Sequence, residues 1–165
     1  MRIWLVVIMA VLLSQTLRGQ VIFGGDSLQT SFEKSVYGLG FSGGPVSGFG
    51  ASFRVHSPGH SSFQINLGLM KTSETTFFST GGTFQYDVVR GTLTRFFIGA
   101  STSYFYYGDG RNRYQAPWRF GVGLGGEFNA VDALHFAFEG AFVYFSNGDI
   151  LPMPQLSLHY YFLTP

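Results

Sequence analysis

The sequence predicts an all-β fold, an eight-stranded antiparallel up-and-down transmembrane β-barrel. Large apolar residues alternate with small or polar ones along eight stretches, and a two-residue period is typical of a strand with two different faces. Short turn sequences separate the stretches, as in a series of hairpins. Aromatic residues make up 18% of the 165 residues and charged residues only 12%, about half the charged share of a soluble domain.

Residues 118–144 show the alternation most clearly. Along the first half, one parity holds Trp118, Phe120, Val122, Leu124 and Phe128, and the other holds Arg119, Gly121, Gly123, Gly125 and Glu127. Along the second half, the large residues are Leu134, Phe136, Phe138, Phe142 and Tyr144, between His135, Ala137, Glu139, Ala141 and Val143. The segment 129–133 contains Asn and Asp, which favour turns, so the stretch predicts a two-faced hairpin.

The same pattern predicts the other six strands. In chain order they are 37–42, 48–56, 62–69, 83–88, 95–104 and 155–162. Turns or loops are expected between them at 43–47, 57–60, 71–80, 90–92, 108–117 and 146–154. With both ends of the chain in the periplasm, the short segments 57–60, 90–92 and 129–133 are periplasmic turns and the mostly longer loops lie outside, which is the asymmetry expected of outer-membrane barrels.

The first 20 residues have the pattern of a signal peptide. Arg2 is followed by an apolar run over Ile3–Leu13 and then by a polar segment that ends near Gln20. The run is too short to cross a bilayer, which takes about 20 apolar residues. The alternative is a buried N-terminal helix. We expect a signal peptide over 1–20, a lead-in over 21–35 and a barrel over 36–162.

Composition excludes several classes of function. The chain has no cysteine, so it has neither disulfides nor a cysteine-based metal site. Ten Lys and Arg residues nearly cancel nine Asp and Glu residues, so no basic surface for nucleic acid is expected. Gly-x-Gly runs at 38–40, 48–50 and 121–123 lie inside predicted strands and do not open a helix, so they do not indicate a nucleotide cofactor. We expect no cofactor and no metal.

Two kinds of barrel fit the alternation. A soluble lipocalin-like barrel turns its large apolar face inward around an apolar ligand and covers its outer face with charged residues. Here the second face is mostly Gly, Ser, Ala, Gln and Asn, with three positive and three negative residues. Small side chains and balanced charges suit the narrow lumen of an eight-stranded barrel, so the sequence favours the membrane barrel.

This choice assigns the two faces. The residues expected to face lipid include Phe120, Val122, Leu124, Phe136, Phe138, Phe142, Leu156, Leu158, Tyr160 and Phe162. The expected polar cluster of the lumen is Arg54, His56, Asp87, Arg95, Glu127, His135 and Glu139. Simple hairpin pairing sets Asp87 opposite Arg95 and Glu127 opposite His135. We expect these pairs to close the lumen, so that it does not conduct freely.

The last predicted strand carries a resemblance to a known family. It reads Leu156-x-Leu158-x-Tyr160-x-Phe162, and Leu163-Thr164-Pro165 follow it. Together with the signal peptide, the eight strands and the aromatic strand ends, this pattern resembles the small bacterial outer-membrane β-barrel family, of the OmpX and OmpA-transmembrane-domain kind. The resemblance implies a Gram-negative outer membrane, contact with its lipid and lipopolysaccharide, help from the outer-membrane assembly machinery, and a monomer.

Catalysis is not expected. His60-Ser61-Ser62 and His159 are the only local suggestions of a nucleophile, and no acid is positioned beside them in the sequence. The leading hypothesis is a structural, adhesive or envelope-interaction role. The alternatives are a narrow pore or small-solute transporter, and a soluble periplasmic barrel that binds an apolar ligand. The predicted fold alone does not choose among them.

Overall fold

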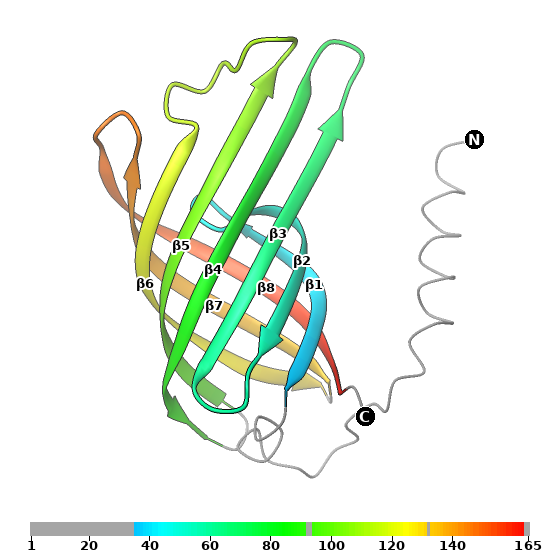
Figure 1. Ribbon diagram of the computed structural model, residues 1–165, viewed down its shortest axis with the longest axis vertical. Helices are drawn as coiled ribbons and strands as arrows, with labels where there is room; N and C mark the ends of the chain where they lie inside the picture. The colour runs from blue at the N-terminus through cyan, green and yellow to red at the C-terminus, as the bar shows by residue number, and fades with distance from the viewer. Residues whose placement is uncertain (1–34, 92–93, 132, 164–165) are drawn as a thin grey trace, which may run out of the picture.

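Eight antiparallel strands form a closed barrel in the computed structural model, and β1 pairs with β8 to complete it. The structure describes residues 35–91, 94–131 and 133–163, so the predicted signal peptide and all but the last residue of the lead-in lie outside the described residues. The strands are β1 (Val36–Gly44), β2 (Gly48–His56), β3 (Ser61–Lys71), β4 (Thr76–Arg90), β5 (Thr94–Gly108), β6 (Trp118–Val131), β7 (Leu134–Phe145) and β8 (Ile150–Leu163) (Figure 1). The predicted eight-stranded up-and-down barrel is confirmed. The described part of the chain contains no helix with the length and apolar character needed to cross a membrane.

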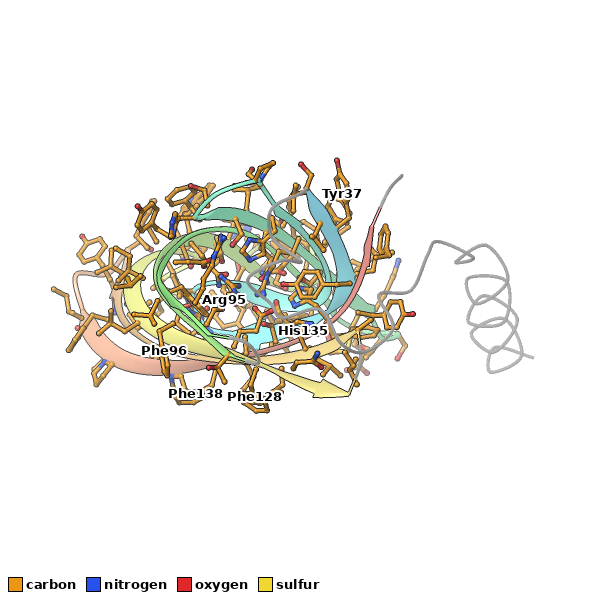
Figure 2. The ribbon with its side chains drawn as sticks, turned by 90° about the horizontal axis from the view of Figure 1, so that it is seen from below. Tyr37, Arg95, Phe96, Phe128, His135 and Phe138 are labelled. Carbon is orange, nitrogen blue, oxygen red and sulfur yellow. The ribbon has the colours of Figure 1, made fainter. Side chains whose placement is uncertain are left out.

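The alternation along each strand sorts side chains between the interior and the outer wall. In β5, Arg95 and Phe97 are buried, whereas Phe96 and Ile98 are 58% and 46% exposed. Figure 2 shows Arg95 and His135 inside the ring of strands, with Phe96 and Phe138 pointing away from it. The polarity is therefore the reverse of that in a soluble domain, where polar groups cover the surface and large apolar side chains fill the core.

Two predicted loops are shorter than expected. The loop predicted over 71–80 is a turn at 72–75, because β4 already begins at Thr76. The loop predicted over 146–154 is a turn at 146–149, and β8 runs through Pro152 and Pro154. Because β1 pairs with β8 only from Leu156 onward, this part of β8 has a free edge, where proline is tolerated.

The predicted register of two hairpins is wrong. Asp87 lies opposite Phe97, not Arg95, and Glu127 lies opposite Ala137, not His135. Each strand pair also changes register close to its turn, between Asp87 and Val89 and between Asn129 and Val131. The error arises because both turns lie further along the chain than predicted, with Arg90 opposite Arg95 and Val131 opposite Leu134, and the β-bulge in each pair then takes back one residue of that shift. The net error is two residues, which leaves every side chain on its predicted face.

Candidate functional site

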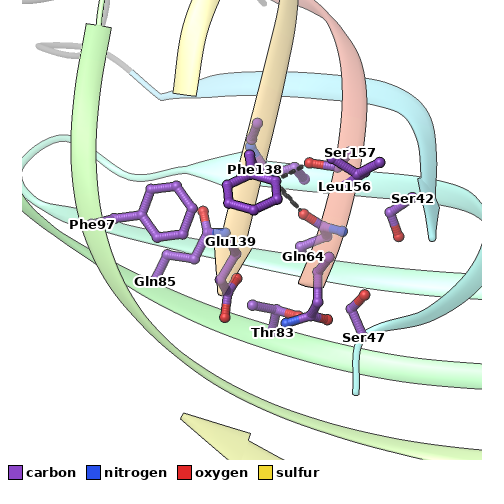
Figure 3. Close-up of a pocket in the computed structure, with 13 residues that line it drawn as sticks. Ser42, Ser47, Gln64, Thr83, Gln85, Phe97, Phe138, Glu139, Leu156 and Ser157 are labelled. Atoms are coloured by element: carbon purple, nitrogen blue, oxygen red, sulfur yellow. Dashed lines mark hydrogen bonds between the residues drawn. The ribbon is translucent and has the colours of Figure 1, made fainter. Parts of the chain in front are cut away.

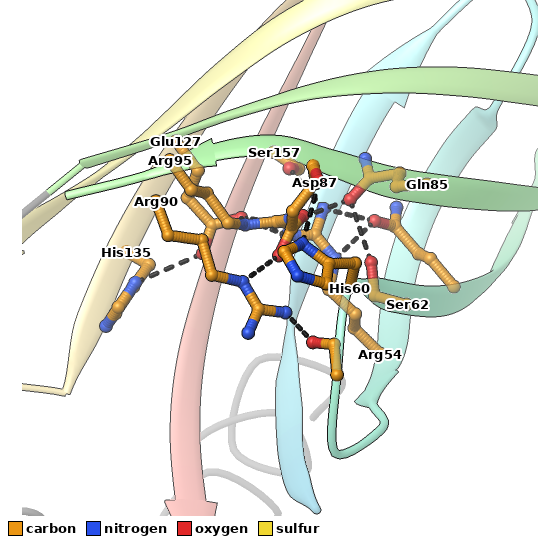
Figure 4. Close-up of polar contacts among 12 residues, drawn as sticks. Arg54, His60, Ser62, Gln85, Asp87, Arg90, Arg95, Glu127, His135 and Ser157 are labelled. Atoms are coloured by element: carbon orange, nitrogen blue, oxygen red, sulfur yellow. Dashed lines mark hydrogen bonds and ion pairs between the residues drawn. The ribbon is translucent and has the colours of Figure 1, made fainter. Parts of the chain in front are cut away.

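The carboxylate of Glu127 on β6 is the centre of a buried ionic cluster (Figure 4). Its Oε2 atom accepts hydrogen bonds from Arg54 Nη1 at 2.5 Å and from Arg95 Nη2 at 2.6 Å. Its Oε1 atom lies 3.1 Å from His135 Nδ1. Arg54, Arg95 and Glu127 are each 1% exposed. One carboxylate therefore joins residues from β2, β5, β6 and β7 across the lumen.

Asp87 on β4 is the second carboxylate of the cluster. It accepts hydrogen bonds from Arg95 Nη1 and, at 2.7 Å, from Arg90 Nε. The contact between Asp87 and Arg95 thus forms although the two residues are not opposite each other. Arg95 also donates to Gln85 Oε1 at 2.8 Å. The predicted partners meet because their side chains share the inner face and are long enough to reach diagonally.

Arg54 uses all five of its N–H donors. Nε and Nη2 both donate to Gln64 Oε1, Nη1 donates to Glu127 and to the Tyr161 hydroxyl at 3.0 Å, and Nη2 also donates to Ser157 Oγ at 3.1 Å. A buried charge is tolerated when it is both paired and fully hydrogen-bonded. The residues Gln64, Ser157 and Tyr161 were not predicted as members of the cluster, although their inner-face parity in the sequence agrees with this role.

The structure places all seven residues of the predicted lumen cluster in the barrel interior, each 6% exposed or less. Glu139 lies apart from the ionic cluster and lines a small cavity with Ser42, Gln155 and others (Figure 3). Of the ten residues predicted to face lipid, those that are exposed are Phe120, Val122, Leu124, Phe138, Phe142, Leu156 and Leu158. The half-buried ones are Phe136, Tyr160 and Phe162.

The turn between β1 and β2, which was predicted as a loop at the outer end of the barrel, folds into the lumen beyond the cluster. Val46 is fully buried and packs with Ala141 and Val143 of β7. The carbonyl oxygen of Ser47 accepts a hydrogen bond from Asn66 Nδ2 at 2.6 Å. Figure 1 shows this hairpin ending part-way along the barrel while β4 and β5 continue past it. In the sequence, the apolar residue Val46 within this turn is the feature that indicates a buried position.

Arg119 of β6 contacts the β1–β2 turn from across the lumen. Its Nη1 donates to the carbonyl oxygen of Pro45 at 3.2 Å. Its guanidinium carbon lies 4.0 Å from the centroid of the Phe105 ring and 5.0 Å from that of Phe145. Cation–π contacts of this kind stabilise a partly desolvated arginine. The lumen is therefore obstructed at two levels, by the ionic cluster and by the β1–β2 turn.

Gly121 of β6 leaves the room that Val46 occupies. A β-carbon built on Gly121 lies 2.8 Å from Val46 Cγ2, closer than two carbon atoms can pack. We expect Gly121→Val to displace the turn and to lower the free energy of unfolding by about 1–3 kcal/mol, as overpacking does. Urea unfolding measures this loss. Gly140→Ala is the control, because a β-carbon there meets nothing within 4 Å. Equal stability of the two variants would contradict the packing of the turn.

Ser52 and His159 form the nearest arrangement to a catalytic pair. Ser52 Oγ lies 2.8 Å from His159 Nε2, and the two residues are 3% and 1% exposed. Among the described residues, His159 Nδ1 has no hydrogen-bond partner, so no carboxylate orients the ring. His60, the other predicted candidate, stacks on Tyr86 and lies 3.0 Å from the carbonyl oxygen of Asp87 through Nδ1. The Ser52–His159 contact joins β2 to β8 across the interior.

No protein-family model, curated protein or solved structure matches this chain. Its fold and interior define its class, a small eight-stranded β-barrel with an apolar outer wall and a packed polar lumen.

Proposed function

We propose that the protein is an integral barrel of a bacterial outer membrane, with a closed lumen, no catalytic activity and a structural, adhesive or envelope-interaction role. The reversed polarity of the barrel is the observation that carries this proposal. Phe41, Leu124 and Phe142 on the outer wall are 69%, 70% and 64% exposed, while arginines and carboxylates are buried inside. Exposing such an apolar wall to water is unfavourable in free energy, whereas contact with the hydrocarbon of a membrane removes that cost.

Aromatic residues near one end of the barrel support the same proposal. Tyr104 and Trp118 are opposite each other on β5 and β6, with ring centroids 4.9 Å apart. Trp118 is 51% exposed and Tyr144 is 46% exposed. Tyrosine and tryptophan are enriched where a membrane protein crosses from hydrocarbon to water. This end is then the level of one membrane interface.

A location in the outer membrane implies particular partners for this protein. A signal peptide over 1–20 exports the chain, the C-terminal strand ending at Phe162 is read by the outer-membrane assembly machinery, and the folded monomer contacts lipid and lipopolysaccharide. These statements rest on the resemblance of the sequence to small outer-membrane barrels.

Cell fractionation tests the proposal. We expect the protein in the outer-membrane fraction, extractable only with detergent, and migrating faster on a gel when unheated than after boiling, because a closed barrel stays compact in detergent. Recovery from the soluble periplasm would contradict the proposal and favour the soluble barrel that binds an apolar ligand.

Conductance separates the closed barrel from the narrow pore. The wild type is expected to give no porin-like steps in a planar bilayer, because the ionic cluster and the β1–β2 turn obstruct the lumen in series. Removing only the two carboxylates of the cluster, with Asp87→Ala and Glu127→Ala, leaves the turn in place and is expected to keep the barrel closed. Adding Gly121→Val to these two changes is expected to allow openings. Open channels in the wild type would support the pore instead.

A further inference from the structure

His159 of β8 is a buried histidine that helps to close the barrel. It is 1% exposed, and its Nε2 atom lies 2.8 Å from Ser52 Oγ. Ser52 on β2 and His159 on β8 are both directly opposite Gly40 of β1, the strand that lies between them. Because glycine has no side chain, the two residues can meet over it on the inner face. Their contact therefore bridges β2 and β8 across β1.

A second side-chain bridge of the same kind links His159 to the ionic cluster. Arg54 and Tyr161 are both directly opposite Gly38 of β1, and Arg54 Nη1 donates to the Tyr161 hydroxyl at 3.0 Å. The ring of Tyr161 stacks on that of His159, with centroids 6.1 Å apart, and meets the ring of His135 edge-on at 4.6 Å. Two side-chain bridges thus cross β1 on its inner face, where β8 closes the barrel.

The charges that face this part of the interior are in positive excess. The titratable side chains there, from β2, β4, β5, β6, β7 and β8, are Arg54, His56, Asp87, Arg90, Arg95, Glu127, His135 and Tyr161. The inner faces of β1 and β3 carry no titratable residue, and Glu139 lies further along β7, opposite Gln155. Three arginines meet two carboxylates, and each carboxylate already contacts two of the arginines. A proton on His159 would add to this positive excess.

The hydrogen-bond partners of His159 fit a neutral ring. A neutral imidazole has one N–H donor and one acceptor, whereas a protonated imidazole has two donors. Ser52 is the partner of Nε2, and among the described residues the buried Nδ1 atom has no hydrogen-bond partner. A protonated ring would bury a charged N–H group without an acceptor, which is strongly unfavourable. His135 differs, because its Nδ1 atom lies 3.1 Å from a carboxylate oxygen of Glu127.

We propose that His159 makes the closure of the barrel acid-sensitive, because the Ser52–His159 bridge across β1 holds only while the ring is neutral. In the unfolded chain a histidine takes up a proton below about pH 6.5. The unfolded state then binds one more proton than the folded barrel, so lowering the pH favours the unfolded state and raising it restores the closure. The bridge lies in the interior, so this proposal does not depend on whether lipid or water meets the outer wall.

Urea unfolding of the detergent-folded protein between pH 7.5 and pH 5.5 tests this proposal. His159→Gln keeps a side-chain amide that can reach Ser52 but cannot take up a proton. Below about pH 6.5, we expect the folded-to-unfolded ratio of the wild type to fall more steeply than that of His159→Gln, by up to about tenfold per pH unit. His60→Gln is the control, because His60 is exposed in the turn between β2 and β3, and it is expected to keep the wild-type pH dependence.

The pH dependence decides the proposal. Equal slopes for the wild type and His159→Gln would overturn it, and so would a slope that is lost in His60→Gln. If His159→Gln does not fold, the nitrogen NMR signals of the His159 ring in the folded wild type at pH 5.5 give the answer. A neutral ring supports the proposal, and a protonated ring overturns it.

Discussion

Replacing Glu127 with alanine is expected to lower the free energy of unfolding by about 3–5 kcal/mol, the range for removing one partner of a buried ion pair. The carboxylate accepts hydrogen bonds from Arg54 and Arg95, which are both 1% exposed. Without it, Arg54 keeps only neutral partners, and Arg95 keeps a single carboxylate, that of Asp87. Urea unfolding followed by the fluorescence of Trp118 measures the loss.

The matched control is an ion pair on the surface. Asp109 and Arg113 in the loop between β5 and β6 are joined at 2.9 Å, with side chains 58% and 54% exposed. We expect Asp109→Ala to change stability by less than about 1 kcal/mol, because water screens exposed pairs. A Glu127→Ala protein as stable as this control would show that the cluster does not hold the strands together.

The cluster shows which part of the site the sequence could predict. Alternation assigns each residue to a face, so Asp87, Arg95, Glu127 and His135 were expected inside and lie there. The pairing register depends on where two turns lie and on the β-bulge beside each of them, and no local sequence signal marked either feature. An error of two residues preserved the faces, and long side chains then reached their expected partners diagonally. The sequence therefore predicted which residues form the cluster and which face of the barrel they lie on, but not which residues are directly opposite each other on neighbouring strands.

Contacts across the lumen could not be predicted in the same way. Arg54 and Glu127 are 73 residues apart in sequence and lie on β2 and β6, which are not neighbours in the barrel. Alternation shows that both side chains point inward, but the curvature of the closed sheet decides which of them meet. The position of the β1–β2 turn could not be predicted for the same reason, because the turn lies inside the lumen in the space left by Gly121 on a distant strand.

The second large effect is expected from a charged substitution on the outer wall of the barrel, and it is measured as a change in the free energy of unfolding. Leu124 lies near the middle of β6 and is 70% exposed. If lipid covers this wall, Leu124→Arg places a charge near the bilayer midplane, which costs about 2–4 kcal/mol in barrels of this class. If water covers it, an exposed leucine-to-arginine change stays within about 0.5 kcal/mol. The free energy of unfolding from lipid vesicles distinguishes the two results.

Gln115→Arg is the control for this substitution. Gln115 is exposed in the loop between β5 and β6, so an added arginine meets water in either case and should leave stability within about 0.5 kcal/mol. The difference between the two arginine variants therefore reports the solvent of the barrel wall, independently of any general effect of added charge. A difference of about zero would mean that the phenylalanines and leucines of the outer wall do not face lipid, and it would contradict the proposed membrane location while leaving the observed barrel unchanged.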